Sequence, residues 1–318
     1  MKRLEGVCVM ETLMRNVLLS LARGKLPNRL ARRYGLRLGA GRFVAGVTIG
    51  QAIEAVKELN RQGKLATLDY LGEFVGSAEE AGQTADMCLS TLAAIAASGV
   101  RANLSLKLTS LGLDVDEALC LSHMRNILRE AERHGLFVRI DMEDFSHCER
   151  AIQAYKTLRQ EFAHVGIAIQ AYLYRSVEDV RNLERLGANL RLVKGAYKES
   201  AEVAFPRKAD VDAQFIELIR MHLSSGCYTA IATHDPRIVD AALAFIAEAA
   251  VPGDRYEFQM LYGIGEELQR RLVEAGCKVR VYVPFGEDWF GYFMRRLAER
   301  PANVWFVLKN LFHRKSAA

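Results

Sequence analysis

The sequence alternates between short apolar runs and longer stretches with helical periodicity. The apolar runs are rich in β-branched, aliphatic and aromatic residues. The stretches between them, such as 178–188 and 239–250, contain good helix formers with apolar positions three or four apart. The runs are residues 65–72, 102–110, 136–144, 166–174, 189–197, 228–235, 256–263 and 278–286. This alternation predicts βα units of a parallel sheet that is buried on both faces.

The number of units favours a closed barrel. Eight strands with helices between them suit an α/β fold of the (β/α)8, TIM-like type better than an open doubly wound sheet. The nearest approach to a dinucleotide-binding fingerprint is Gly39 and Gly41 followed by Val44 in place of the third glycine, and no strand precedes it. The sequence contains no phosphate-loop, zinc-protease or serine-hydrolase motif, so the chemistry must sit elsewhere.

The pattern divides the chain into two parts. Residues 1–45 are predicted to form an N-terminal helical segment, and residues 46–318 the barrel domain, which begins with a helix from Thr48 to Gln62. The first residues have a positive start and an apolar centre, as in a signal peptide, but charges interrupt that centre and favour an amphipathic helix. No segment approaches the roughly 20 uninterrupted apolar residues that a membrane span requires.

Charge and cysteine usage narrow the class of protein. The 318 residues hold 43 Lys and Arg against 38 Asp and Glu, so the net charge of +5 is small, and no nucleic-acid partner is expected. The six cysteines lie singly, without the spacing of a zinc site or a redox dithiol, which indicates a reduced cytoplasmic protein without a bound metal. The basic stretch at residues 309–318 allows at most a peripheral contact with the inner face of a membrane.

Polar residues gather where the predicted strands end. In a β/α barrel the active site is built at the carboxyl ends of the strands, and a charge inside the barrel is costly unless it is paired or used. Any one of these side chains could point into water or pair with a helix carboxylate, but the whole set together predicts an active site. The set comprises Lys107, Asp141, Glu143, Asp144, Gln170, Tyr172, Arg191, Lys194, Tyr197, Thr233, His234, Asp235, Gln259 and Tyr282.

A further group of charges lies on the helix predicted after the last strand, at residues 289–300. Arg295 and Glu299 are four residues apart and share a helix face, so they could form a solvated surface pair. Alternatively, Arg295 and Arg296 could clamp a carboxylate through bidentate hydrogen bonds. The sequence alone slightly favours the surface pair.

Nine short segments, spread over the whole predicted barrel, resemble the proline dehydrogenase family and occur in the order seen there. The combination of RLVKGAY (191–197), FQMLYGI (258–264) and YFMRRLAE (292–299) is specific. The likeness is to the short monofunctional bacterial enzymes, because the chain stops where a fused aldehyde dehydrogenase domain would begin. The other segments are TLDYLGE (67–73), SLKLTSLG (105–112), RIDMED (139–144), QAYLYR (170–175), ATHD (232–235) and VYVPFG (281–286).

The resemblance implies an activity, a cofactor and a substrate site. The chain would hold FAD noncovalently across the strand ends, beneath its last helix. It would oxidise L-proline to Δ1-pyrroline-5-carboxylate by hydride transfer to flavin N5, the first step of proline catabolism. Lys107, Arg295 and Arg296 would bind the substrate carboxylate, supported by Asp141 and Glu299. The walls of the pyrrolidine pocket would be Tyr197, Tyr282, Leu192 and Leu261.

The resemblance also implies a set of flavin contacts. Arg191 would lie near N5, where its charge favours the reduced flavin. The contacts to the rest of the cofactor would come from Gln170, Lys194, Gly195, Ala196, Thr233, His234 and Gln259. Lys198 and Asp235 depart from the family pattern, so their contacts with FAD stay open. No residue is an obvious base for the substrate ammonium, and proton loss to solvent or to the enzyme both stay open.

The implied partners are L-proline, a quinone or another electron acceptor, and a pyrroline-5-carboxylate dehydrogenase that receives the product. Two hypotheses from other classes are kept. The chain could be a Schiff-base aldolase that uses Lys107 or Lys194 as its nucleophile. It could also be a basic barrel that serves as a scaffold and binds no cofactor.

Overall fold

The computed structural model describes residues 40–72 and 74–299, apart from the side chains of Ala40, Arg295 and residues 297–299. Residues 1–39 of the predicted N-terminal helical segment lie outside this range. The helical segment and its boundary with the barrel domain therefore stay predictions. Within the described part, the segment ends in a short 3-10 helix, η2, Ala40–Arg42.

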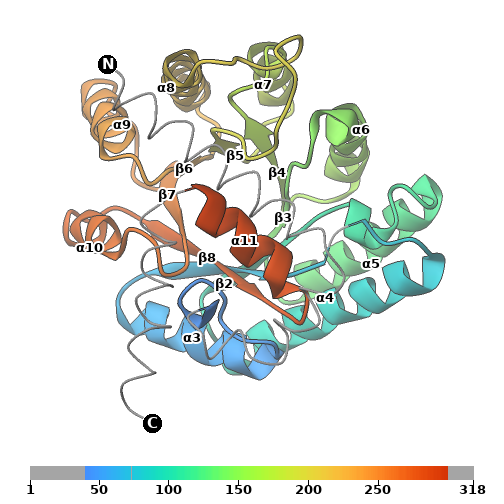
Figure 1. The fold of residues 1–318 in the computed structure, drawn as a ribbon. Helices are drawn as coiled ribbons and strands as arrows, with labels where there is room; N and C mark the ends of the chain where they lie inside the picture. Colours follow the sequence, from blue (N-terminus) through green and yellow to red (C-terminus); the bar gives the residue numbers. More distant parts are fainter. Residues whose placement is uncertain (1–39, 73, 300–318) are drawn as a thin grey trace, which may run out of the picture.

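Eight parallel strands close into a barrel in sequence order, with helices arranged around them (Figure 1). Each strand falls on one predicted run, which confirms the (β/α)8 fold, and each ends before its run does. The strands are β1 Leu65–Tyr70, β2 Ala102–Leu106, β3 Val138–Ile140, β4 Val165–Gln170, β5 Leu190–Val193, β6 Thr229–Ala232, β7 Tyr256–Leu261 and β8 Val279–Phe285. The ends of the runs form loops at the barrel mouth.

The helices begin where the sequence supplies caps. Thr48 caps α3 in a capping box, with its Oγ1 accepting from the Gln51 N–H at 3.3 Å, and Asp235 caps α9 just before Pro236. The 3-10 helix η3 is Thr109–Leu111. The α-helices are α3 Ile49–Arg61, α4 Ala78–Ser98, α5 Glu117–Arg133, α6 Phe145–Glu161, α7 Ser176–Glu184, α8 Lys208–Ser224, α9 Pro236–Glu248, α10 Glu266–Glu274 and α11 Trp289–Glu299.

The amino-terminal end of the barrel is filled by a charged layer instead of branched apolar side chains. The Arg280 Nε donates to both carboxylate oxygens of Glu257, at 2.8 and 3.1 Å, and the Arg280 guanidinium also donates to the Ala66 carbonyl at 2.8 Å. Arg139 donates to the Asn189 carbonyl at 2.6 Å. We call Arg139, Glu257 and Arg280 the floor. The floor closes this end of the barrel. Its hydrogen bonds offset part of the free-energy cost of removing these charged groups from water.

Helix α11 lies across the opposite end of the barrel (Figure 1). Its buried Trp289, Phe290, Tyr292, Phe293 and Met294 form one apolar cluster with residues that follow the strands. The other members of the cluster are Phe43, Val44 and Leu71, with Val47, Ile264 and Tyr282 packed against it. Since Leu71 follows β1 and Ile264 follows β7, this packing confirms that the last predicted helix covers the carboxyl ends of the strands.

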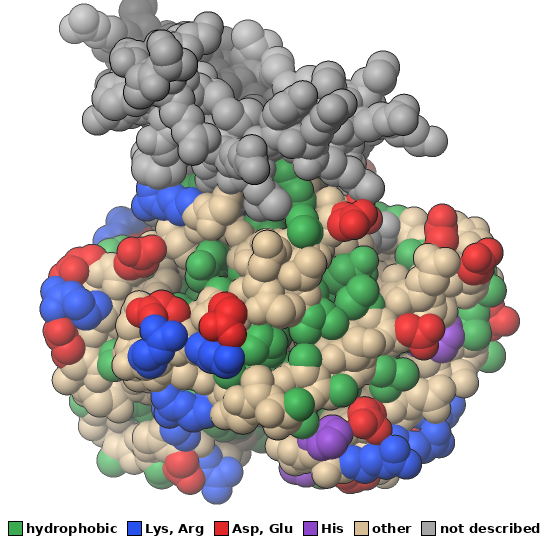
Figure 2. Space-filling view, turned by 90° about the horizontal axis from the view of Figure 1, so that it is seen from below, with side chains coloured by type: hydrophobic (Ala, Val, Ile, Leu, Met, Phe, Trp, Pro, Cys, Tyr) green, Lys and Arg blue, Asp and Glu red, His purple; other side chains and the backbone are tan. Residues whose placement is uncertain are grey.

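The described surface carries charges of both signs. On the face in Figure 2, blue and red side chains lie next to one another and apolar side chains occupy the space between them. Across residues 40–72 and 74–299, no helix combines the length and the apolar character needed to span a bilayer.

Candidate active site

Asp141, directly after β3, is the centre of a hydrogen-bond network inside the mouth of the barrel. Its Oδ1 accepts from the Ser105 Oγ at 3.0 Å and from the Arg191 guanidinium, which also donates to Ser105 Oγ at 3.0 Å. Its Oδ2 accepts from the Tyr282 hydroxyl at 2.8 Å. The network joins side chains of β2, β5 and β8 to Asp141 after β3, so polar groups from four βα units meet at one barrel end.

Tyr282 lies between two carboxylates. Its hydroxyl is 2.6 Å from Asp69 Oδ2 and 2.8 Å from Asp141 Oδ2. Lys107 Nζ is 3.2 Å from the same Asp69 oxygen and 3.9 Å from Asp141 Oδ2. Burial, followed by the charge of Asp141, raises the pKa of the Tyr282 phenol well above its usual value, so the phenol keeps its proton.

The Arg191 guanidinium also links the mouth to the floor. Its Nε donates to the Gln259 Oε1 at 2.6 Å, and the Gln259 amide donates to Glu257 at 2.5 Å. The Arg191 guanidinium also lies over the Tyr282 ring, with its Cζ 5.3 Å from the ring centroid. A cation fixed by three neighbours and almost buried is well suited to face a ligand that becomes negative during a reaction.

Arg296 on α11 is buried, and its guanidinium lies 5.1 Å from the centroid of the Tyr292 ring. Arg296 is not a member of the Arg295–Glu299 surface pair that the sequence slightly favoured, so its burial leaves that prediction untested. The side chains of Arg295 and Glu299 lie outside the described residues, so their pairing and their substrate contacts stay predictions.

Thr233 and His234, two of the predicted cofactor residues, directly follow β6 and lie beside the end of β7. The His234 Nε2 accepts from the Leu261 N–H at 2.9 Å, which fixes the ring beside the end of β7. Thr233 is buried, and its Oγ1 accepts from the Asp235 N–H at 3.1 Å. Leu261 lies two residues beyond Gln259 on β7 and so shares its face of the strand, which directs Leu261 into the mouth.

Lys194 is tied to two acidic side chains, Asp212 at 2.5 Å and Asp235 at 3.2 Å. Burial opposes ionisation of Asp235, but hydrogen bonds from Lys194 and Arg237 dominate and lower its pKa to about 2. Asp235 thus has a structural role, as the cap of α9 and the partner of Lys194. The predicted contact of Lys194 with the cofactor stays a prediction.

The backbone of Gly195 lies in close contact with the ring of Tyr172. It has a φ of +117°, and a Cβ there would lie 2.6 Å from Tyr172 Cγ and closer still to the next ring atoms. The Tyr172 hydroxyl is buried without a hydrogen-bond partner among the described residues. Ala196 is exposed and Tyr197 half-buried in the same loop. Gln170, at the end of β4, donates to the Glu143 carbonyl at 2.7 Å.

The structure does not bring Leu192 to this site. Leu192 follows Arg191 on β5, and successive strand side chains point to opposite faces. Its partners in register are Ile169 and Ile231, and all three belong to the main hydrophobic core outside the barrel. With a side chain that faces the helices, Leu192 packs the barrel wall, so the proposed ring contact lacks support.

Two features of the site were missed from the sequence. Asp69 lies in the middle of the first run and is absent from the predicted set of polar residues at the strand ends. The sequence feature that could have identified Asp69 is its spacing from Thr67. Two polar residues two positions apart share one face of β1. The register places Asp69 beside Ser105, on the interior face.

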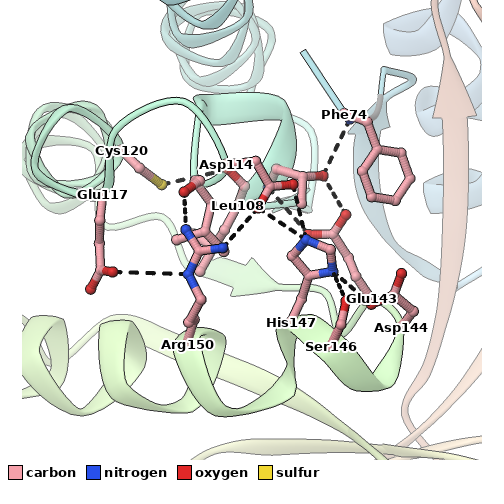
Figure 3. Close-up of polar contacts among 12 residues, drawn as sticks. Phe74, Leu108, Asp114, Glu117, Cys120, Glu143, Asp144, Ser146, His147 and Arg150 are labelled. Carbon is pink, nitrogen blue, oxygen red and sulfur yellow. Dashed lines mark hydrogen bonds and ion pairs between the residues drawn. The ribbon is translucent and has the colours of Figure 1, made fainter. Parts of the chain in front are cut away.

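The second feature is a charged cluster on the outer rim, which Figure 3 shows in close-up. The His147 Nε2 is 2.9 Å from Asp114 and its Nδ1 2.6 Å from Asp144, while the Arg150 guanidinium donates to Asp114 at 2.7 Å. We call His147, Asp114, Asp144 and Arg150 the rim cluster. It ties α6 to the loop after η3. The ring of Phe74, from the loop after β1, lies 5.8 Å from the His147 ring.

A closed parallel barrel with paired charges converging at its mouth, under a helix that carries a buried arginine, is the arrangement of a β/α-barrel enzyme. Comparison with known proteins gives the family. The family model described as Proline dehydrogenase matches residues 52–309. This chain belongs to the proline dehydrogenase family.

Individual relatives agree with the family model. The chain is 52% identical over 299 residues to Proline dehydrogenase 1 of Bacillus subtilis (strain 168), covering 94% of this chain and 99% of that protein. It is 42% identical over 308 residues to Proline dehydrogenase of Deinococcus radiodurans, covering 95% and 99%. Among solved structures, proline utilization A (PutA) from Bdellovibrio bacteriovorus inactivated by N-propargylglycine matches with a TM-score of 0.78 and 25% identity. That match covers 90% of this chain and 36% of the PutA chain.

Proposed function

We propose that this chain is a flavin-dependent proline dehydrogenase, which oxidises L-proline to Δ1-pyrroline-5-carboxylate as the first step of proline catabolism. The observation that carries the proposal is the convergence of Lys107, Tyr282 and Asp141 inside the mouth, beneath the helix that carries the buried Arg296. The site offers cations for a carboxylate and a phenol ring for a small apolar ring. Both parts match the chemistry of proline.

The substrate carboxylate is bound by cations from two directions. Lys107 lies at the end of β2, and Arg296 lies on α11, where Arg295 is proposed to join it. Asp141 and Asp69 keep Lys107 in place and prevent unbalanced positive charge while the site is empty of substrate. Charge-assisted hydrogen bonds in a buried site orient the substrate strongly, because water no longer competes for them.

The ring of the substrate is held against apolar surface. The proposed walls are Tyr282, from the middle of β8, Tyr197, from the loop after β5, and Leu261, at the end of β7. Helix α11, fixed on the mouth by its aromatic cluster, excludes water from the reacting carbon. A ring hydroxyl at the position of 4-hydroxyproline meets the Tyr282 phenol, which is already committed to two carboxylates.

FAD is the cofactor that the residues of the mouth fit. When bound, it supplies the acceptor of the hydride. Three observations support the fit: the fixed cation of Arg191, the unpartnered buried hydroxyl of Tyr172, and the lack of a side chain at Gly195. The positive charge of Arg191 would favour the electron-rich, reduced form of the flavin ring. The remaining contacts would come from Gln170, Lys194, Ala196, Thr233, His234 and Gln259.

The aldolase hypothesis loses support from the contacts of the two lysines. Lys107 lies 3.2 Å from Asp69, and Lys194 lies 2.5 Å from Asp212. Carboxylates at these distances stabilise the charged ammonium, whereas a Schiff-base nucleophile needs a free amine. The scaffold hypothesis gives no reason for a network of buried charges at the mouth. Reduction with borohydride in the presence of substrate would trap a lysine adduct if the aldolase hypothesis were right.

The decisive experiment is an absorbance spectrum recorded without oxygen, before and after addition of L-proline. A purified protein that shows a flavin spectrum and is bleached by L-proline supports the proposal. A colourless protein that takes up no added FAD, or a flavin that L-proline leaves oxidised, contradicts it.

The proposal extends to the partners of the reaction. A membrane quinone would reoxidise the flavin, with the chain in the cytoplasm and in contact with the inner face of the membrane only peripherally. A pyrroline-5-carboxylate dehydrogenase would receive the product. The likeness to PutA, of which this chain spans about a third, supports looking for such a partner. Reoxidation of the bleached enzyme by a soluble quinone analogue tests the first of these steps.

A further inference from the structure

One carboxylate oxygen of Asp69 holds two groups of the proposed substrate pocket. Its Oδ2 accepts from the Tyr282 hydroxyl at 2.6 Å and from Lys107 Nζ at 3.2 Å. The other oxygen, Oδ1, is buried without a hydrogen-bond partner among the described residues. Asp69 is only 1% exposed. Its two partners both belong to the mouth and neither to the floor.

The contacts of Tyr282 make Asp69 sensitive to protonation. A phenol carries one proton and can donate it to only one acceptor at a time. Asp69 and Asp141 both lie within hydrogen-bonding distance of that hydroxyl. One hydroxyl proton therefore cannot stabilise both carboxylates, and the two negative charges repel each other across the phenol. Proton uptake by one of the two carboxylates removes the conflict.

The surroundings of Asp69 determine which carboxylate takes up that proton. Burial, then the neighbouring charge of Asp141, act against the positive charge of Lys107 and raise the pKa of Asp69 to about 6. Asp141 has further donors, Ser105 and Arg191, that Asp69 lacks. The groups that face Asp69 are Lys107 and Ser105 from β2 and its end, Asp141 after β3, Tyr282 from β8 and Cys88 from α4.

We propose that Asp69 is a positioning residue of the substrate pocket, which anchors Lys107 and Tyr282 and, by its ionisation, sets the charge that the substrate carboxylate meets. This inference rests on the proposed function. When Asp69 is ionised it neutralises Lys107 and repels an incoming carboxylate. When Asp69 takes up a proton, the positive charge of Lys107 is released to the ligand.

A merely structural role does not explain these contacts. The strand β1 is held by backbone pairing with β2 and β8, in which the Asp69 side chain takes no part. The charges of the floor are satisfied without Asp69. When Asp69 is replaced by a neutral side chain of the same shape, Lys107 still has the carboxylate of Asp141 at 3.9 Å, so the barrel should stay folded.

The test is the isosteric variant Asp69→Asn, compared with Asp240→Asn, which removes an exposed carboxylate paired with Arg271 on the outer helices at 3.1 Å. Two quantities are measured on the flavin-loaded proteins. One is kcat/KM for L-proline. The other is the Kd of tetrahydrofuran-2-carboxylate, obtained by calorimetry over a range of pH. This probe has an ether oxygen in place of the ring nitrogen, so its pH dependence reports groups of the protein and not an amine of the ligand.

For the wild type and Asp240→Asn, the probe should bind more tightly as pH falls through about 6, because proton uptake by Asp69 favours an anionic ligand. For Asp69→Asn, this pH dependence should disappear, and kcat/KM should fall about 10- to 100-fold because Lys107 and the phenol lose their common anchor. The melting temperature should match the wild type. An unchanged pH dependence, or kcat/KM within about twofold of the wild type, overturns the inference.

A second variant keeps the inference testable if Asp69→Asn fails to fold or to hold flavin. Tyr282→Phe keeps the aromatic ring and Asp69 but removes the hydroxyl group. The hydrogen bond from that hydroxyl lowers the pKa of Asp69. The midpoint of the pH dependence of probe binding should therefore move to higher pH. A midpoint that stays in place overturns the inference. Failure of the proposed function is seen separately, as a wild-type flavin that L-proline does not bleach.

Discussion

The ring of Tyr172 lies against the backbone of Gly195 so closely that position 195 has no room for a Cβ atom. The two residues come from the loops after β4 and β5, and the Tyr172 N–H donates to the Lys194 carbonyl at 2.9 Å. Their contact locks two neighbouring strand ends together at the mouth. It also leaves the Tyr172 hydroxyl without a partner among the described residues, in the region proposed for FAD.

Gly195→Ala should lose stability and flavin together. The new Cβ meets the Tyr172 ring, and a φ of +117° is strained for alanine, which together should cost about 1 to 3 kcal/mol. We expect a lower unfolding free energy in urea and a weaker FAD affinity by fluorescence titration. Gly82→Ala is the matched control, because Gly82 lies within α4 with no atom near its Cβ position, and should stabilise the chain slightly. Equal effects of the two substitutions would contradict the importance of the contact.

Arg296→Met should keep the fold and the flavin while catalysis collapses. Removing a charge-assisted contact to a buried carboxylate costs about 2 to 5 kcal/mol, or roughly thirtyfold to several thousandfold in kcat/KM for L-proline. Arg295→Met should behave alike if its side chain reaches the same carboxylate. Arg133→Met, which removes an exposed arginine of α5, serves as the control. Near wild-type efficiency in either α11 variant would remove that arginine from the substrate site.

Tyr282→Ser should change the choice of substrate. The smaller side chain opens the space that the phenol ring fills, so the ratio of kcat/KM for 4-hydroxyproline to that for L-proline should rise. The absolute value for L-proline should fall, because Asp69 and Asp141 lose the donor between them. Both values follow from steady-state rates with each substrate. An unchanged ratio would place Tyr282 outside the pocket.

The rim cluster should make stability depend on pH through His147. Burial opposes its charged form, but the hydrogen bonds to Asp144 and Asp114 prevail and raise the pKa of His147. A raised pKa in the folded state means that the imidazolium stabilises the fold fully below the unfolded value of about 6.5, and that this contribution is lost as pH rises through the folded value.

We therefore expect His147→Asn to be destabilised by about 1 to 2 kcal/mol near pH 5.5 and by progressively less at alkaline pH. The burial of Asp114 and Asp144 is likewise outweighed by hydrogen bonds, from His147 and Arg150 to Asp114 and from Ser146 and His147 to Asp144, which lower both pKa values. Their contribution fades only in stronger acid. Urea unfolding at several pH values measures the difference, with the more exposed His134→Asn as control. A difference that is independent of pH would show that His147 acts in its neutral form.

Leu192→Ala should separate packing from substrate binding. Leu192 is fully buried in the core on the helix side of β5, so its truncation should cost about 2 to 5 kcal/mol of unfolding free energy. The KM for L-proline should stay within about twofold of the wild type. A large rise in KM, with little loss of stability, would restore Leu192 to the ring pocket.

The period of the apolar runs predicted βα units, and the number of units favoured the closed barrel over an open doubly wound sheet. Eight buried strands, each with a helix behind it, have few other ways to cover both faces, and the polar residues at the run ends fixed which end carries the chemistry. Single residues were less predictable. The family resemblance assigned both Leu192 and Arg191 to the site, although neighbours on a strand face opposite ways.

Contacts between distant loops were not predictable at all from a single sequence. Asp69 accepts a hydrogen bond from Tyr282, which lies 213 positions away in the chain, and only this contact reveals its place in the site. The rim cluster joins Asp114 to His147 only because the barrel brings the loops after β2 and β3 together. Local pattern gives the strand and its buried face, but the partner across the barrel depends on register and shear, which no local signal encodes.

The strand that opens the barrel is paired with the one that completes it, since β1 lies beside β8 and α11 follows directly. During synthesis on the ribosome, the nascent chain therefore carries two unpaired strand edges and an uncovered polar interior until residues 279–299 have emerged. Translation that halts before that point leaves a sheet with a ready surface for mispairing and no catalytic pocket. Because the barrel closes only when the last strand pairs with the first, a partly synthesised chain has no catalytic pocket. Chaperones can protect its exposed strand edges until that pairing forms.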